Sequence, residues 1–256
     1  MKSFAAFFKK ELLESLRSGK LMILAILFAV FGIMNPAIAK LTPWLLEVMA
    51  GELAESGMTV TSVTVDALTS WTQFFKNIPM ALVVFACLYG GIFTKEYENE
   101  TLILVLTKGL SRYKVVLSKT LLMLTLWTLG YWLCFAVTYA YNAYYWDNSI
   151  AQSLLSAILY WWLFGILVIA LMVLFSVITK AYSGVLIGAG GCVLAMYLLE
   201  LLPKLSDVMP TSLMQGMSIL IGAKPAADFL PAVLIAAASS VLLVLASVLL
   251  FNKKEL

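Results

Sequence analysis

The sequence has 256 residues, of which 62% are hydrophobic and 12% are charged. Because a soluble domain carries roughly 25% charged residues, this composition excludes a water-soluble fold and indicates a membrane protein. There is no histidine, so the commonest general base and metal ligand is missing. The cysteines Cys87, Cys134 and Cys192 lie far apart in apolar segments and predict neither a disulfide framework nor a metal site.

The first 20 residues predict a helix that lies in the membrane interface. Apolar residues recur at helical spacing, at Phe4, Phe8, Leu12 and Leu16. Charged residues fill other positions around the helix, at Lys9, Lys10, Glu14 and Arg17. A cleaved signal peptide is the alternative, because a basic stretch precedes an apolar run and the small residues 37–39. The acids within the stretch favour a retained helix.

Six stretches without Asp, Glu, Lys or Arg can each cross a bilayer: 21–39, 77–94, 120–146, 148–179, 181–199 and 229–252. About 20 helical residues span roughly 30 Å of hydrocarbon. No segment alternates polar and apolar residues as a strand of a membrane barrel would. We therefore predict an all-α, polytopic membrane protein with a single domain over 1–256 and spans near 21–39, 77–94, 120–146, 154–179, 181–200 and 231–251.

The distribution of basic residues predicts the orientation. Most of the 17 lysines and arginines fall at the two ends of the chain and on alternate connections. The remaining lysines fall on the other side, where acids outnumber them: Lys40, Lys76, Lys204 and Lys224. By the positive-inside rule, both termini are predicted to lie in the cytoplasm.

The outer connection 40–76 contains Trp44, Leu45 and Val48 beside Glu47, which predicts an interfacial helix. The sequence leaves open whether this connection gates a pore or only caps the bundle.

Two features of the fifth span allow a functional and a structural interpretation. Gly184 and Gly188 have the spacing at which membrane helices approach closely, either at a dimer interface or within one bundle. Glu200 ends the span and is a candidate substrate-binding residue, or it lies in the headgroup layer near Lys204.

The connection between the second and third spans has the clearest pattern. Acids come first, followed by an aliphatic run, a lysine and a glycine, at Glu96, Glu98, Glu100, 102–106, Lys108 and Gly109. This order is typical of a short helix with a complemented dipole and a glycine stop. A second helix is predicted to begin at Ser111 as its N-cap and to run into the third span. Five consecutive aliphatic residues need burial against the bundle, the membrane or a partner.

With these motifs the sequence resembles the permease subunits of bacterial ABC-2 type exporters. Residues 7–20 resemble the elbow helix that precedes six spans in that family. The loop near 96–114 resembles the family's coupling region. The matching positions are Glu96, Glu98, Thr101, 102–106, Thr107, Ser111, Arg112 and Lys119. The resemblance implies a coupling helix that binds a groove on a separate ATPase through Glu96, Glu98, Glu100, Thr101, Leu104, Thr107, Lys108 and Arg112.

The resemblance implies the membrane subunit of an ATP-driven exporter in a bacterial plasma membrane, with two ATPases and a second copy of the permease. The chain has no G-x-x-x-x-G-K-[ST] loop, so ATP and Mg²⁺ are expected on the partner subunit. No catalytic residue, cofactor, metal or nucleic-acid partner is expected on the chain itself.

The apolar spans favour an amphipathic or hydrophobic cargo, such as a peptide, drug or lipid-like molecule. In size and layout the chain resembles exporters of peptide toxins, including phenol-soluble modulins. The alternatives are a non-transporting sensor or immunity protein and an intramembrane enzyme. The lack of histidine and of paired buried acids disfavours the enzyme.

Overall fold

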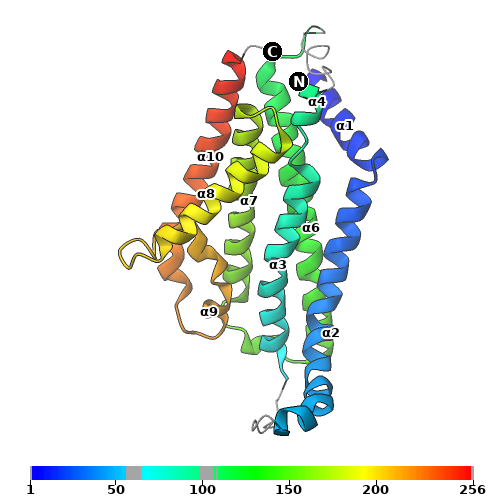
Figure 1. The fold of residues 1–256 in the computed structure, drawn as a ribbon, viewed down its shortest axis with the longest axis vertical. Coiled ribbons are helices and arrows are strands. Elements are labelled where there is room, and N and C mark those ends of the chain that lie inside the picture. Colours follow the sequence, from blue (N-terminus) through cyan, green and yellow to red (C-terminus); the bar gives the residue numbers. More distant parts are fainter. Residues whose placement is uncertain (1, 56–64, 99–106, 108, 255–256) are drawn as a thin grey trace.

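A computed structural model describes residues 2–55, 65–98, 107 and 109–254. The regular elements in these ranges are all helical (Figure 1). In chain order they are α1 (Lys2–Arg17), α2 (Lys20–Glu55), α3 (Ala67–Tyr89), α4 (Thr94–Glu98), α6 (Arg112–Tyr145), η1 (Asn148–Ile150), α7 (Leu154–Ile178), α8 (Tyr182–Glu200), η2 (Pro210–Met214), α9 (Gly216–Leu220), η3 (Ala226–Phe229) and α10 (Leu230–Lys253).

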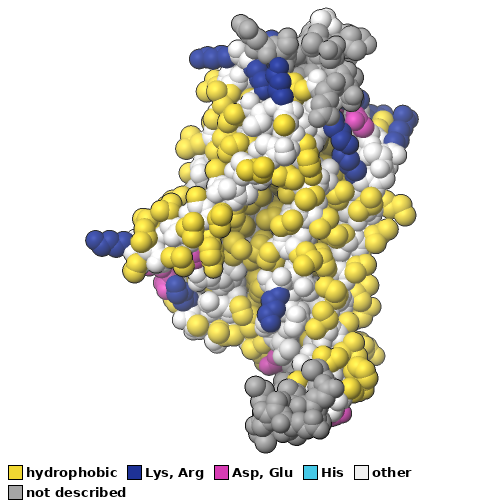
Figure 2. Space-filling model, in the orientation of Figure 1, with side chains coloured by type: hydrophobic (Ala, Val, Ile, Leu, Met, Phe, Trp, Pro, Cys, Tyr) yellow, Lys and Arg dark blue, Asp and Glu magenta, His cyan; other side chains and the backbone are white. Residues whose placement is uncertain are grey.

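Within the described ranges, six helical segments are long and apolar enough to cross a membrane: Lys20–Val48, Ala67–Tyr97, Arg112–Tyr145, Leu154–Ile178, Tyr182–Glu200 and Ala226–Lys253. The predicted all-α fold with six spans is therefore confirmed. Both termini lie at one end of the molecule, called here the terminal end, and α8 crosses the bundle obliquely (Figure 1). Apolar side chains cover most of the face shown in Figure 2.

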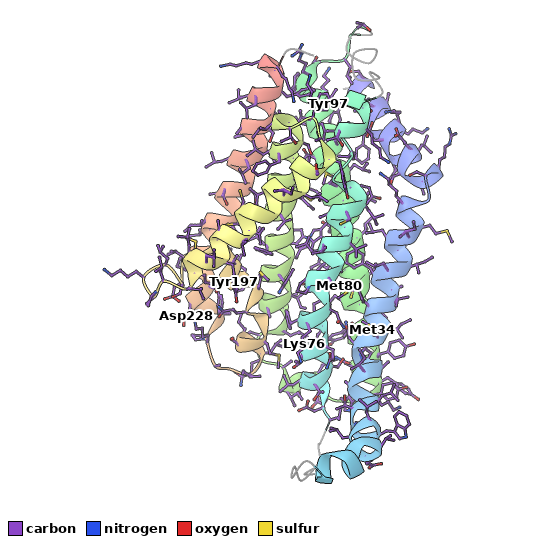
Figure 3. All side chains as sticks on the ribbon, viewed as in Figure 1. Met34, Lys76, Met80, Tyr97, Tyr197 and Asp228 are labelled. Atoms are coloured by element: carbon purple, nitrogen blue, oxygen red, sulfur yellow. The ribbon has the colours of Figure 1, made fainter. Side chains whose placement is uncertain are left out.

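Two spans extend well beyond the charge-free stretches. α2 continues past residue 39 to Glu55, so the expected interfacial helix is the end of this same helix. α3 begins at Ala67 instead of 77, where the side chain of Asp66 accepts the backbone N–H of Thr69 at 2.9 Å. Lys76 therefore lies inside a helix, where its side chain is exposed (Figure 3). A long lysine side chain can reach water from such a position, so a single charge does not end a span.

The continuity of α2 through Pro36 depends on a neighbouring helix. Proline has no N–H, so the carbonyl of Gly32 loses its helical partner. The hydroxyl of Thr138 on α6 donates to that carbonyl at 3.1 Å. Asn35 donates to the same hydroxyl at 3.0 Å, and Asn77 on α3 donates to Asn35 at 2.8 Å. These bonds replace what proline removes and connect α2, α3 and α6.

Aromatic rings fill the centre of the bundle. Trp127 on α6 lies edge-on to Phe28 and Phe85, with ring centroids 5.9 and 5.7 Å away. The hydroxyl of Tyr131 donates to the carbonyl of Ile158 at 2.8 Å, so the polar end of this buried ring is satisfied. These contacts join α2, α3, α6 and α7 in one core.

Two glycines allow the helices to approach these rings. A β-carbon at Gly130 would lie 2.5 Å from Phe28, and one at Gly165 would lie 2.3 Å from Trp127. Membrane helices gain stability from such close packing, because no hydrophobic force drives them together in lipid.

Among the six spans, α8 is the one least covered by the described part of the chain, which buries only Val185 and Ala189 of this helix. A β-carbon at Gly188 would meet the ring of Phe175 on α7 at 2.3 Å, and one at Gly184 would meet Thr179 at 3.0 Å. These two glycines therefore pack against α7 and its end within one bundle, which is the structural interpretation of their spacing.

The connection between α8 and α10 folds back into the bundle, although the sequence predicted an outer loop. Buried residues occur through η2 and α9, including Leu213 and Leu220. The indole N–H of Trp161 on α7 donates to the carbonyl of Met214 at 3.1 Å. Short helices satisfy much of their own backbone, which allows this segment to be buried.

Replacing Gly165 with alanine should destabilise the protein. Alanine has the higher helix propensity, by about 1 kcal/mol. At Gly165 the clash with Trp127 outweighs this gain, since overpacking costs about 1–3 kcal/mol. Gly190→Ala is the matched control, because no atom lies within 4 Å of its β-carbon position. In detergent, the melting temperature of Gly165→Ala should lie below that of the native protein, and that of Gly190→Ala should equal or exceed it. Equal melting temperatures of the two variants would contradict the proposed close packing.

Candidate functional site

The described members of the predicted ATPase-binding set, Glu96, Glu98, Thr107 and Arg112, belong to the terminal end, where Figure 3 labels Tyr97. Glu96 lies on α4, and Arg112 is the first residue of α6 after the predicted N-cap Ser111. Gly109 has a φ of +87°, as a glycine helix stop requires. Glu98 ends α4, and Thr107 is exposed. Other predicted residues lie outside the described ranges: Glu100, Thr101, Leu104 and Lys108.

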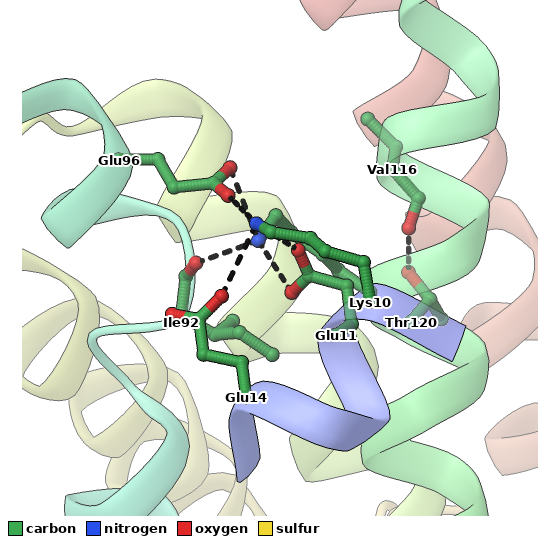
Figure 4. Close-up of polar contacts among 8 residues, drawn as sticks. Lys10, Glu11, Glu14, Ile92, Glu96, Val116 and Thr120 are labelled. Carbon is green, nitrogen blue, oxygen red and sulfur yellow. Dashed lines mark hydrogen bonds and ion pairs between the residues drawn. The ribbon is translucent and has the colours of Figure 1, made fainter. Parts of the chain in front are cut away.

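Glu96 belongs to an ion-pair cluster that the sequence did not predict, made by Lys10, Glu11, Glu14, Glu96 and Lys119 (Figure 4). The ammonium of Lys119 on α6 lies 2.8 Å from Glu11 Oε2 on α1 and 3.1 Å from Glu96 Oε2 on α4. The ammonium of Lys10 lies 2.9 Å from a carboxylate oxygen of both Glu11 and Glu96. Each lysine therefore bridges the same two carboxylates.

The centre of this cluster is buried. The side chains of Lys119, Glu11 and Glu96 are only 1%, 4% and 9% exposed. Lys119 also donates to the carbonyl of Ile92 at 3.0 Å, so its ammonium has three polar neighbours. Paired charges can be buried together, but removing one partner leaves the others without compensation.

The outer part of the cluster reaches the surface through Lys10. Burial acts to lower the pKa of Lys10, but hydrogen bonds to Glu96 and Glu11 outweigh it and raise the pKa above its usual value. Lys10 is therefore protonated at physiological pH. Its third carboxylate partner is Glu14, 3.1 Å away and one turn further along α1.

α1 is held against the bundle by a face next to its predicted apolar stripe, and Phe8 and Leu12 of that stripe are partly buried against the core. Its buried residues are Phe7, Glu11 and Ser15, whereas Leu16 is exposed. The hydroxyls of Ser15 and Tyr89 on α3 lie 2.8 Å apart. A hydropathy pattern treats each acid by itself and therefore places Glu11 on the surface. The partners on α4 and α6 that permit its burial are distant in sequence, so the pattern does not include them.

Arg112 fixes the other end of the predicted loop. Its guanidinium donates to the carbonyls of Phe251 at 3.2 Å and Asn252 at 3.4 Å, and also to that of Lys254. These carbonyls lie at the C-terminal end of α10, where the helix dipole favours a cation.

Lys254 extends this contact to a further helix. Its ammonium donates to the carbonyl of Val177 near the end of α7 and lies 4.6 Å from the ring centroid of Tyr97. Burial lowers the pKa of Lys254, and the nearby charge of Lys180 adds to the effect. Arg112 and Lys254 thus join α6, α7 and α10 beside the loop.

Glu200, the weak substrate-binding candidate, is half-buried at the end of α8. Its Oε1 accepts a hydrogen bond from the side-chain amide of Gln215, the residue between η2 and α9. In the described part of the chain its buried Oε2 has no hydrogen-bond partner.

Six membrane-crossing helices with a charged cluster at the terminal end define a polytopic membrane protein. The family profile described as ABC-2 family transporter protein matches residues 5–256. The chain therefore belongs to the ABC-2 transporter family, whose members are transmembrane components that pair with ABC ATPase subunits. A comparison with curated proteins gives no match.

Replacing Lys119 with methionine should strongly destabilise the protein. The change keeps the volume but leaves Glu11 and Glu96 buried with one cation fewer, and breaking such a pair costs about 3–5 kcal/mol. Lys9→Met on α1 is the control, because Lys9 is exposed and has no ion pair in the described part of the chain. Thermal unfolding in detergent should show a large loss of melting temperature for Lys119→Met and little change for Lys9→Met. Equal melting of Lys119→Met and Lys9→Met would contradict a structural role for the cluster.

Proposed function

We propose that this chain is the permease subunit of an ATP-driven exporter, in which residues 96–112 receive the motion of the ATPase. The observation that carries the proposal is the pair of anchors that flank this segment. Glu96 joins its start to α1 and α6, and Arg112 joins its end to α10. A displacement of the segment would therefore move several spans together.

The anchors indicate that the predicted ATPase-binding residues have two different roles. The charged atoms of Glu96 and Arg112 are engaged within the chain, so these two residues transmit motion. Contact with the ATPase then belongs to the segment between them, and above all to the aliphatic run around Leu104. This interpretation retains the predicted binding region and assigns different roles to its ends and its middle.

The charge distribution supports placing the terminal end in the cytoplasm, where an ATPase has its nucleotide. Lys10, Lys20, Arg112, Lys119 and Lys254 all lie close to this end. Cytoplasmic loops of membrane proteins carry such an excess of basic residues. The plasma membrane of a bacterium is the location that fits this arrangement.

Assembly with a second copy of the chain is supported by α8. Most of its apolar surface has no cover from the rest of the described chain. A cavity of about 320 Å³ lies between α3, α7 and α8, lined by apolar residues such as Leu82, Phe164 and Val193. Its lining supports an amphipathic or hydrophobic cargo, such as a peptide, drug or lipid-like molecule.

The proposal predicts that Leu104→Asp prevents assembly with the ATPase. An unpaired charge in a buried docking surface costs several kcal/mol. Leu104→Ile is the control, because it keeps the apolar character and nearly the volume. Tagged chains purified from native membranes in mild detergent should retain an ABC ATPase with Leu104→Ile and lose it with Leu104→Asp, as read by mass spectrometry. Equal retention by both variants would show that this segment is not the docking surface.

A second arm of this experiment separates binding from transmission. Arg112→Ala removes the contact with α10 but leaves the middle of the segment intact. The variant should still retain the ATPase, while the ATP hydrolysed per substrate exported should rise. Loss of the ATPase from Arg112→Ala would instead assign this residue to the docking surface.

A further inference from the structure

A groove on the outside of the bundle lies beside the ion-pair cluster, between α1, α6, α7 and α10. Its volume is about 430 Å³, within the range of roughly 300–1,000 Å³ that holds small ligands. Its walls include Phe4, Leu121, Ile166, Val241 and Leu245. Leu121, Val241 and Leu245 are 43%, 60% and 53% exposed, so the groove is open on its outer side.

The described residues that line the groove offer no free polar group to a ligand. Two hydroxyls line the groove, and both bond to their own helix: Thr120 donates to the carbonyl of Val116 at 2.8 Å (Figure 4), and Ser240 donates to that of Ala236 at 2.6 Å. An apolar chain can therefore enter without leaving a buried hydroxyl unsatisfied. Three of the four helices that form the groove, α6, α7 and α10, are long and apolar enough to cross a membrane, so we expect its open side to face hydrocarbon.

A cation stands at the terminal rim of this groove. Lys114 precedes the groove residues Leu117 and Leu121 by one and two helical turns, which places it on the same face of α6. Its ammonium lies 3.1 Å from the hydroxyl of Ser3, next to the groove residue Phe4. In the described ranges Lys114 has no carboxylate partner.

We propose that this groove binds one anionic phospholipid from the leaflet at the terminal end. An acyl chain would lie along the apolar walls, and the phosphate headgroup would meet Lys114 and Ser3. Charge complementarity selects the occupant, because cytoplasmic leaflets are negatively charged and a lysine near their surface attracts anionic lipid. The bound lipid would brace α1 against α6 and α10, next to the cluster that the first helix shares with α4.

The test measures lipid binding to the purified full chain by native mass spectrometry, with phosphatidylglycerol and phosphatidylcholine of identical acyl chains. Ser240→Phe fills the groove, and Ser239→Phe is the matched control on the neighbouring, non-lining position. Lys114→Gln removes the rim charge, and Lys9→Gln removes an exposed charge elsewhere near the terminal end.

The native chain should bind one phosphatidylglycerol more tightly than phosphatidylcholine. Ser240→Phe should abolish this binding and Ser239→Phe should keep it. Lys114→Gln should weaken the binding of phosphatidylglycerol about fivefold and leave the binding of phosphatidylcholine unchanged. Equal binding of the two lipids, or equal effects of the two phenylalanine variants, would overturn the proposal. If Ser240→Phe instead dissociates a dimer, the groove is a protein interface. If it does not fold, the comparison of Lys114→Gln with Lys9→Gln decides alone.

Discussion

A lysine ammonium removed from water requires compensation, and the compensation of Lys119 determines how the terminal end is built. Its carboxylate partners come from α1 and α4, which are far from α6 in sequence. Because the desolvation of three charges is offset only when all are present, these helices must pack together or not at all. Lys10 closes the arrangement from the solvent side by bridging the same two carboxylates. The first helix is thus a structural part of the bundle, in addition to any contact with the membrane surface.

The remainder of the architecture is arranged around this fixed end. Arg112 and Lys254 tie α6 to α10 and α7 through backbone carbonyls, so the segment 96–112 begins and ends at anchored points. Aromatic packing around Trp127 continues the rigid contact through the centre of the bundle. α8, in contrast, buries little of its surface in the described chain. A motion applied at the anchored end would therefore be transmitted through packed side chains to most spans. α8, which lies beside the apolar cavity, is the weakly held exception.

The number of spans and the start of α6 after Ser111 could be predicted because each follows from the local sequence, although the Ser111 side chain makes no capping hydrogen bond. Gly109 has the positive φ of a helix stop, but the helix predicted before it lies outside the described residues. The lengths of α2 and α3 could not be predicted, because a lone charge such as Lys76 can remain on a helix surface and Pro36 receives help from another helix. The cluster was missed for the same reason. Glu11 and Lys119 are separated by most of the first half of the chain, and each alone scores as a surface residue. No local pattern shows that charged residues so far apart will meet inside the fold.

The most direct measurement is the distance between spin labels at Ser18→Cys and Lys95→Cys, in a background without Cys87, Cys134 and Cys192. Ser18 directly follows α1, and Lys95 lies on α4. Both residues are exposed and lie beside the cluster. In the complex with its ATPase, a rigid unit held by the cluster predicts one narrow distance distribution that stays the same with and without ATP. Lys119→Met should broaden it. A distribution that shifts when ATP binds to the unmodified cluster would show that α1 and α4 move separately, and would contradict the role assigned to these ion pairs.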